Sequence, residues 1–243
     1  MVNLKKKVKS KIVISGGSGR FGKILKNVKS NYKIYTPSKT EMDILKIDSI
    51  EKYLKKVKPN IFLHLAALSR PMNIHNEKVD LSIKLNIIGT ANVAIVCEKL
   101  KVKLIYISTN FVYPGVKGNH KETDYIKPFN NYGWSKLGGE CSVQMCKNSL
   151  ILRMCMTEEP FIHNKTFSDV KTNFEYHKNI APIIFKLLNK KGIINIGGKT
   201  RSIFEFAKSK GILTQKIYAK KLFGKDYPLR QDMNLNKLKK ILN

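Results

Sequence analysis

Short apolar runs alternate with amphipathic segments along the first 155 residues of the chain. The apolar runs are typical of buried parallel strands and cover residues 11–15, 33–36, 60–67, 103–109 and 149–153. Between them, apolar residues recur at helical intervals of three and four, at about residues 21–28, 48–57, 79–100 and 132–146. This rhythm predicts an α/β fold, a doubly wound parallel sheet with helices on both faces.

Beyond residue 155 the alternation loosens. A helix is expected over residues 180–188 and a strand over residues 192–197. Ser202 and Glu205 have the spacing of a capping box, as Asp48 and Glu51 do earlier in the chain, and each pair is expected to open a helix. We therefore predict two parts, residues 1–155 and a small C-terminal lobe of residues 156–243 that is interleaved with the sheet.

The composition is that of a packed globular protein. Of the 243 residues, 42% are hydrophobic and 26% are charged, which disfavours disorder and a disulfide scaffold. No uncharged apolar stretch of membrane-spanning length and no signal peptide is recognised, so a cytoplasmic protein without membrane insertion is expected. Cys97, Cys141, Cys146 and Cys155 lie in apolar segments without metal-binding spacing and are expected to be reduced core thiols.

The formal net charge of +29 raises the question of nucleic-acid binding. Only five of the 46 basic residues are arginine, the residue that recognises phosphates and base edges best. The lysines are spread along the whole chain, so we expect solvated surface lysines and no specific nucleic-acid partner. The charge would still attract a small anion into a cleft.

A glycine-rich turn follows the first apolar run and opens the first helix. Gly16 permits a tight turn, Gly19 allows the backbone to approach a pyrophosphate, and Gly22 allows close packing of helix on strand. Such turns also occur for packing alone, but this position in a strand–turn–helix unit favours dinucleotide binding in a Rossmann-like fold.

The end of the second strand bears on the choice of cofactor. An acidic residue there would accept a hydrogen bond from the ribose of NAD, whereas hydroxyl and basic groups suit the 2′-phosphate of NADP. This chain has Ser38 and Lys39 at that place and Arg20 in the glycine turn. NADP(H) is therefore favoured and NAD(H) remains possible, the alternative being that Ser38 and Lys39 are ordinary loop residues.

Tyr132 and Lys136 lie four residues apart at the start of a predicted helix and therefore share one face. A lysine there can lower the pKa of the phenol. With a nearby hydroxyl such as that of Thr109, the phenol could give a proton to a carbonyl oxygen as hydride arrives. Taken alone, this spacing is also that of an ordinary exposed pair.

Together with His64-Leu-Ala-Ala67, Asn86 and Ser108-Thr109, these motifs resemble the extended short-chain dehydrogenase/reductase superfamily over about residues 11–155. The segments Ser108–Gly115 and Asn131–Glu140 are most similar to the dTDP-4-dehydrorhamnose reductase group. The resemblance implies reduction of the C4 ketone of a nucleotide-linked 4-keto-6-deoxyhexose, in surface-polysaccharide or deoxysugar synthesis.

The resemblance also implies roles for individual residues. Tyr132 would be the general acid, Lys136 would bind the nicotinamide ribose and tune Tyr132, and Thr109 would bind the substrate carbonyl. Asn86 would support Lys136 through a water molecule. The cofactor would further contact Gly16, Gly19, Arg20, Phe21, Gly22, Ser38, Lys39, Asp43, Ile44, Ala66, Ala67 and Ser69, and the substrate would contact Thr109, Asn110, Phe111 and Trp134, although Trp134 could equally pack.

This chain departs from the group in two ways. Asn110 and Phe111 stand where the reductases usually have Asp-Tyr, which puts the sugar specificity in question. Their neutrality also argues against the dehydratases, which carry acids after the Ser-Thr pair. The C-terminal lobe is short for the group, so its pocket is expected to be open or completed by another subunit, and a homodimer is possible.

The histidines give weaker indications of function than these motifs. His64 is expected to be a hydrogen-bonded core residue, and the scattered histidines predict no catalytic metal. Two rivals to the reductase stay open: a nucleotide-sugar epimerase with bound NAD, and a non-catalytic NADP-binding regulatory subunit that docks on a partner enzyme.

Overall fold

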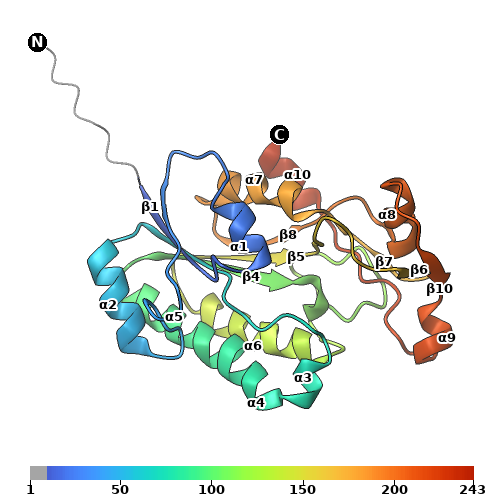
Figure 1. Cartoon of the computed structure of the whole chain (residues 1–243), viewed down its shortest axis with the longest axis horizontal. Coiled ribbons are helices and arrows are strands. Elements are labelled where there is room, and N and C mark those ends of the chain that lie inside the picture. The colour runs from blue at the N-terminus through green and yellow to red at the C-terminus, as the bar shows by residue number, and fades with distance from the viewer. Residues whose placement is uncertain (1–9) are drawn as a thin grey trace, which may run out of the picture.

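The computed structural model describes residues 10–243 and is built on a six-stranded parallel sheet with strand order β2-β1-β3-β4-β5-β8 (Figure 1). The basic leader, residues 1–9, lies outside the described residues. The strands of this sheet are β1 (Lys11–Ser15), β2 (Lys33–Tyr35), β3 (Ile61–His64), β4 (Lys103–Thr109), β5 (Ser149–Met154) and β8 (Gly192–Ile196). The predicted parallel α/β fold is confirmed.

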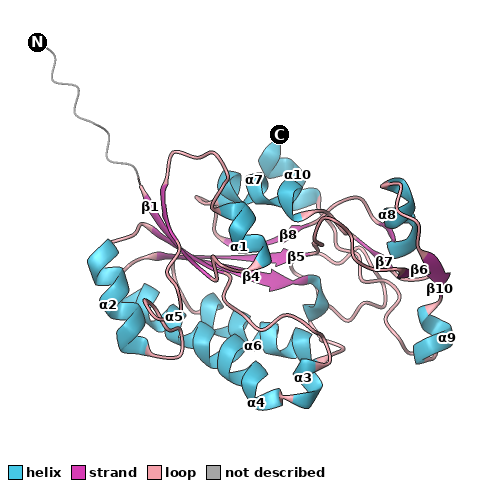
Figure 2. Cartoon of the chain, in the orientation of Figure 1, coloured by secondary structure: helices cyan, strands magenta, loops and turns pink. Residues whose placement is uncertain are grey.

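Helices cover both faces of the sheet (Figure 2). One face packs against α1 (Arg20–Leu25), α7 (His177–Leu187) and α10 (Asn236–Leu242). The other packs against α2 (Ile47–Val57), α5 (Gly89–Lys99) and α6 (Asn131–Gln144). The four inner strands, β1, β3, β4 and β5, read as nearly continuous apolar runs because both of their faces are buried.

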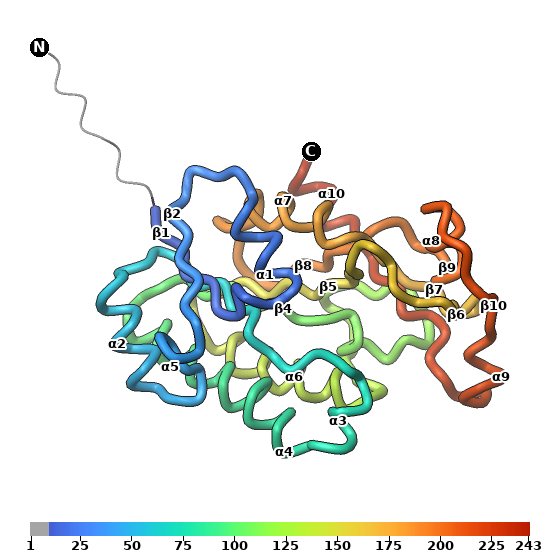
Figure 3. The backbone as a smooth tube through the Cα atoms, viewed as in Figure 1, coloured from blue at the N-terminus to red at the C-terminus, as the bar shows by residue number. Residues whose placement is uncertain are grey.

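The strand order reverses between β1 and β3. The chain passes outward from β1 to β2, then crosses back to β3 and continues away from it, as the backbone trace in Figure 3 shows. Loops leaving the carboxyl ends of β1 and β3 therefore diverge and leave a crevice at this edge, which is where open α/β sheets bind ligands. The glycine turn follows β1, so the topology places it at this crevice.

A continuous helix spans Val79–Lys99 and joins α4 (Val79–Ser82), the π-helical turn η1 (Ile83–Ile88) and α5. By length and composition alone it is apolar enough to cross a membrane, which differs from our expectation that the chain has no such stretch. In the fold it packs against α2, α6 and the sheet. These contacts bury one side of the helix, whereas the apolar side chains of Val79, Ile83, Ile88 and Ile95 on it remain exposed.

Helix α6 lies unusually close to its neighbours because of its glycines. A Cβ atom on Gly139 would stand 2.5 Å from the Tyr106 hydroxyl and 2.8 Å from the Asn86 carbonyl oxygen, and one on Gly138 would stand 2.8 Å from the Ile87 side chain. Distances below 3 Å are closer than side chains tolerate, so these positions accept only glycine without a shift. The close contacts at Gly138 and Gly139 thus fix the position of α6, which was predicted as a helix from its apolar spacing.

A buried ion pair ties α6 to the sheet. Arg153 in β5 and Glu140 in α6 are both fully buried, and three nitrogen–oxygen distances between them lie between 2.8 and 3.2 Å. Arg153 also donates to the Tyr113 hydroxyl at 2.9 Å. Arg153 is therefore a structural residue.

The C-terminal residues contribute to the main sheet and to a smaller region beside it. Strand β8, helix α7 and helix α10 belong to the main sheet and its cover. The smaller region holds two short sheets and two helices: β6 (Lys165–Phe167) with β10 (Gln215–Ile217), β7 (Lys171–Thr172) with β9 (Arg201–Ser202), α8 (Ile203–Ser209) and α9 (Ala219–Phe223). The division into residues 1–155 and 156–243 stays a prediction.

Three local predictions are corrected or confirmed. The capping box at Ser202 and Glu205 is present in full at the start of α8. The one at Asp48 is wrong: α2 begins at Ile47, and the Ser49 hydroxyl instead accepts a hydrogen bond from the backbone of the preceding loop. Cys141 is exposed, not a core thiol, because it lies on the outer side of α6.

Substitution Glu140→Gln tests the buried ion pair. It leaves the Arg153 charge buried without its anion, so the free energy of unfolding should fall by about 3 to 5 kcal/mol in urea titrations. Glu159→Gln is the matched control, because Glu159 forms an exposed pair with Lys178 and should change stability by less than about 1 kcal/mol. Equal effects of the two substitutions would contradict this account.

Candidate active site

The glycine turn packs tightly between the ends of β2 and β3. Gly16 has a φ of +71°, and a Cβ atom on it would lie 2.8 Å from the Ala66 nitrogen. A Cβ on Gly17 would lie 2.5 Å from the Thr36 side chain, and one on Gly19 would lie 3.1 Å from the Gly16 oxygen. The turn is thus a cradle free of side chains at the crevice, and this fits a dinucleotide whose diphosphate needs close backbone approach.

Tyr132 is held at the start of α6 by the surrounding backbone. The Asn130 side chain caps the helix by accepting a hydrogen bond from the Gly133 nitrogen at 2.7 Å. Gly133 packs on the Phe111 carbonyl, where a Cβ would come within 2.4 Å of the oxygen. These contacts bring Tyr132 beside the end of β4, where Thr109 stands.

Two aromatic rings flank the half-buried Tyr132. The Phe111 ring lies edge-on at 6.0 Å between centroids, and the His75 ring lies at 5.0 Å. His75 is itself fixed by a 2.7 Å hydrogen bond between its Nδ1 and the Ser82 hydroxyl. Sequence analysis missed His75, because a single histidine in a polar loop carries no motif.

The environment keeps the phenol of Tyr132 protonated. Burial raises the pKa of Tyr132 to about 12, and interactions with the Thr109 side chain and with the positive charge of Arg70 act in the opposite direction. At neutral pH the group is therefore a proton donor, as a general acid must be.

Lys136 is buried one helical turn beyond Tyr132, as their spacing predicts. Its Nζ lies 4.2 Å from the centre of the Tyr106 ring. Burial lowers the pKa of Lys136 to about 7, and the Glu140 carboxylate on the next turn opposes that shift. Lys136 is thus poised to change its charge near neutral pH.

The side chain of Asn86 is engaged by protein partners. Its side-chain oxygen accepts from the Leu68 nitrogen at 2.7 Å, and its amide donates to the Leu68 carbonyl and the Ser135 hydroxyl. Both amide hydrogens are used, and the support of Lys136 through water stays a prediction. Asn86 fastens the loop after β3 to α6, and it does so from a π-helical turn, a feature often found at functional sites.

The predicted substrate residues divide into three situations. Phe111 contacts the Tyr132 ring and so belongs to the site. Asn110 is buried and donates to the Gln231 carbonyl at 3.2 Å, so its amide is turned toward the C-terminal segment. Trp134 is 51% exposed and faces an apolar groove between α6 and the helix Val79–Lys99. Two residues span about half a helical turn, so Trp134 lies on the side of α6 opposite to Tyr132.

The loop after β2 contains an acid that sequence analysis did not use. The Glu41 carboxylate accepts hydrogen bonds from the Ser38 nitrogen at 2.8 Å and from its hydroxyl at 3.0 Å. Ser38 and Lys39 are exposed, as a 2′-phosphate site requires, but the donors of Ser38 are already engaged. The spacing Ser38-x-x-Glu41 is that of a capping box and could have revealed the contact.

The other predicted cofactor residues lie in the loops that follow β3 and precede α2, and their contact with a cofactor stays a prediction. Ala66, Ala67 and Ser69 are half-buried in the loop after β3, and Asp43 and Ile44 precede α2. The Ile44 carbonyl accepts from the Asn92 side chain, so this segment is anchored on α5.

Arg20 and Phe21 diverge at the start of α1. Arg20 is exposed and forms an ion pair with Glu158. The Phe21 side chain is buried in the core with its ring 5.1 Å from that of His177, so contact with a cofactor would fall to its backbone, and its place in the cofactor site stays a prediction. Sequence analysis also missed Arg70, which is hydrogen-bonded to Glu158, because the two residues lie 88 positions apart.

His64 is confirmed as a core residue. Its ring nitrogens contact the Ser15 hydroxyl at 2.7 Å and the Thr90 hydroxyl at 3.1 Å, and burial lowers its pKa to about 3. Within residues 10–243 no three histidine, cysteine or acidic side chains gather as a metal site would need. That the reaction uses no metal stays a prediction.

The buried Lys136 predicts a specific dependence of stability on pH. Its pKa is about 7 in the fold against an ordinary 10.5, so below pH 7 both states carry the proton and the buried charge destabilises the fold. From pH 7 toward 10.5 the folded state has lost the proton while the unfolded chain retains it. Stability relative to Lys136→Met should therefore rise with pH, by up to about 1.4 kcal/mol per unit.

Urea unfolding of both proteins at pH 7, 8 and 9 measures this difference. Lys178→Met, which removes an exposed lysine, is the control for a general charge effect. A gap between wild type and Lys136→Met that stays constant from pH 7 to 9 would refute the assigned shift.

Comparison with known proteins places this geometry in a family. The family model described as RmlD substrate binding domain matches residues 10–159. A dTDP-4-dehydrorhamnose reductase of Aggregatibacter actinomycetemcomitans is 28% identical over 203 residues, 79% of this chain and 64% of that protein. Methionine adenosyltransferase 2 subunit beta of Xenopus laevis is 28% identical over 152 residues, 58% of this chain and 45% of that subunit.

The fold of a solved relative agrees. The crystal structure of dTDP-4-dehydrorhamnose reductase from Bacillus anthracis in complex with NADP superposes with a TM-score of 0.85 at 24% identity, covering 95% of this chain and 92% of that one. This chain spans just under two thirds and just under half of the lengths of the two sequence relatives. The chain belongs to the RmlD substrate-binding-domain family and has the extended short-chain dehydrogenase/reductase fold of the dTDP-4-dehydrorhamnose reductases.

Proposed function

We propose that the protein is a cytoplasmic NAD(P)H-dependent reductase, with NADPH favoured, that converts the C4 ketone of a nucleotide-linked 4-keto-6-deoxyhexose to an alcohol. The observation that carries the proposal is the placement of Tyr132 beside Thr109 at the carboxyl end of β4, with Lys136 one turn further along α6. The dehydrorhamnose reductase of Aggregatibacter supports the sugar class.

Each residue has a chemical task in this reaction. The bound nicotinamide supplies the hydride that reaches the carbonyl carbon. Tyr132 gives its phenolic proton to the carbonyl oxygen, and the Thr109 hydroxyl hydrogen-bonds that oxygen and orients it. The protonated form of Lys136 stabilises the phenolate that Tyr132 leaves behind. The glycine turn would hold the diphosphate, because its glycines let the backbone approach closely.

A second candidate is a regulatory subunit that binds a dinucleotide and docks on another enzyme. The likeness to methionine adenosyltransferase 2 subunit beta favours this second candidate. The identity is 28% to this subunit and to the reductase alike, although it extends over fewer residues of the subunit. The retained Tyr132, Lys136 and Thr109 favour catalysis, because a pocket that only binds has no need of a proton donor. The third reading, an epimerase, would retain NAD through purification and consume none.

Tyr132→Phe tests the reductase directly. NADPH oxidation is followed by absorbance with a panel of nucleotide-linked 4-keto-6-deoxyhexoses. Loss of the proton donor should lower kcat at least about 100-fold while the Kd for NADPH changes less than about 3-fold. Tyr125→Phe, at an exposed tyrosine of the preceding loop, should leave both unchanged. Full turnover by Tyr132→Phe would reject the assignment, and tight binding without turnover across the panel would favour the regulatory subunit.

The loop after β2 tests the choice of cofactor. Lys39→Gln should weaken NADPH by about 10-fold and NADH little, because only NADPH carries a 2′-phosphate. Glu41→Gln should change the preference in the opposite direction, since it removes a carboxylate that engages the Ser38 donors. Fluorescence titration with both nucleotides measures the ratio. Equal effects of Lys39→Gln on the two cofactors would remove the 2′-phosphate argument.

A further inference from the structure

Three charged side chains meet at the crevice from segments far apart in the sequence. Arg20 follows β1, Arg70 follows β3, and Glu158 follows β5. One Glu158 oxygen lies 3.5 Å from the Arg20 Nε, and the other accepts a hydrogen bond from the Arg70 Nη1. Both arginines thus share a single carboxylate.

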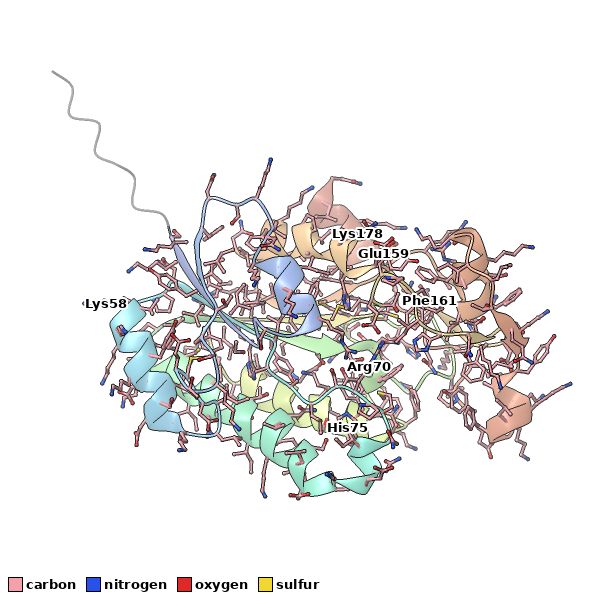
Figure 4. The ribbon with its side chains drawn as sticks, in the orientation of Figure 1. Lys58, Arg70, His75, Glu159, Phe161 and Lys178 are labelled. Carbon is pink, nitrogen blue, oxygen red and sulfur yellow. The ribbon has the colours of Figure 1, made fainter. Side chains whose placement is uncertain are left out.

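This contact spans the crevice. In the sheet, β4 lies between β5 and β3, and both β3 and β4 lie between β5 and β1. The segment after β5 must therefore reach across these strands to meet Arg20. In Figure 4, Arg70 lies between His75 and the segment that carries Glu159 and Phe161. Glu158 therefore joins Arg20, in the turn after β1, to Arg70, in the loop after β3.

The exposures of the three groups differ in a way that suggests exchange. The Glu158 side chain is 15% exposed, against 52% for Arg20 and 33% for Arg70. The carboxylate is thus the most enclosed member, and the two guanidinium groups retain open sides. A guanidinium has five donors, so neither arginine is saturated by one carboxylate.

The other titratable groups nearby do not neutralise the arginines. His177 is buried with no hydrogen-bond partner for its Nδ1, and burial lowers its pKa to about 4. The charges that act on His177 are those of Glu158, Arg70 and Arg20, and those that act on His163 are Arg70 and Glu158. With both histidines neutral, the positive charges of Arg20 and Arg70 face the single negative charge of Glu158. An anion of charge −2 would balance the two arginines better than this one carboxylate does.

We propose that Arg20 and Arg70 form a two-guanidinium clamp for the diphosphate of the dinucleotide, and that Glu158 occupies this clamp until the diphosphate displaces it. Binding is then an exchange of anions, in which oxygen atoms of the diphosphate replace those of the carboxylate on the same donors. The inference rests on the proposed function in so far as that function requires a bound dinucleotide.

The clamp has two consequences for the free protein. Glu158 keeps the arginines from repelling each other across the crevice, which stabilises the cofactor-free form at the expense of affinity. It also gives the clamp selectivity, because a ligand with one phosphate at its adenosine end offers no oxygen to Arg70. Affinity for the diphosphate should accordingly depend on both arginines and be opposed by Glu158.

Glu158→Gln tests the clamp by removing the competing charge while keeping the shape. Isothermal titration of the variant with ADP-ribose, which contains the diphosphate, should show about 10-fold tighter binding than wild type. Adenosine 2′-monophosphate, which lacks the diphosphate, should bind both proteins alike. Glu159→Gln is the matched control, because it removes the neighbouring exposed carboxylate and should leave both affinities unchanged.

Arg70→Gln is the complementary variant and does not depend on Glu158→Gln folding well. It should weaken ADP-ribose about 10-fold and leave adenosine 2′-monophosphate unchanged. In the double variant Glu158→Gln/Arg70→Gln the gain from Glu158→Gln should largely disappear. Unchanged affinity of Glu158→Gln for ADP-ribose, or an equal gain for both ligands, would overturn the clamp.

The outcomes also separate the clamp from the reductase. Tighter ADP-ribose binding by Glu158→Gln in a protein that reduces no sugar would support the clamp and reject the reductase. Sugar reduction by a protein whose ADP-ribose affinity is insensitive to Glu158 would reject the clamp alone. Failure of wild type and variant alike to bind ADP-ribose would overturn both.

Discussion

Close packing of α6 against β4 and the helix Val79–Lys99 is the constraint on which the site depends. Gly138 and Gly139 allow the helices to touch, and the buried pair of Arg153 and Glu140 fastens α6 to the sheet. Because α6 cannot shift, Tyr132 and Lys136 are presented at a fixed place beside the end of β4. The same packing desolvates both groups and thereby sets their pKa values, so position and reactivity have one cause.

Topology supplies the other half of the site. The strand order reverses at β1 and β3, where open α/β sheets bind ligands, and the glycine turn lies at this point because it follows β1. The loop after β3 is fastened to the helix Val79–Lys99 by Asn86, whose amide holds the backbone of Leu68. The cofactor-binding half and the proton-donating half are thus joined by one buried side chain.

Most of the fold could be predicted from the sequence, because its strands are short apolar runs and its glycines mark a turn of known geometry. The pair of Tyr132 and Lys136 could also be predicted, since helical periodicity alone puts them on one face. What escaped prediction depends on side chains that meet only after folding. Asn86 belongs to a motif that can be recognised in the sequence, but its hydrogen-bond partner Leu68 does not. Likewise, no sequence feature links Arg70 to Glu158.

Local context explains the remaining differences in the same terms. The Phe21 ring is buried where α7 closes the sheet face beneath α1, so contact with a cofactor would fall to its backbone. Trp134 shares a short segment with the reactive residues, but helical geometry turns it to the opposite side. Glu41 was not predicted, and the folded loop makes its carboxylate the partner of Ser38.

The most direct measurement of the central claim follows the transferred hydrogen. The protein is incubated with NADPH carrying deuterium at C4 of the nicotinamide and with a nucleotide-linked 4-keto-6-deoxyhexose, and the sugar product is examined by mass spectrometry and proton NMR. This account predicts one deuterium at the former carbonyl carbon for each NADPH consumed. A product without deuterium, or a bound nucleotide that is never consumed, would contradict it.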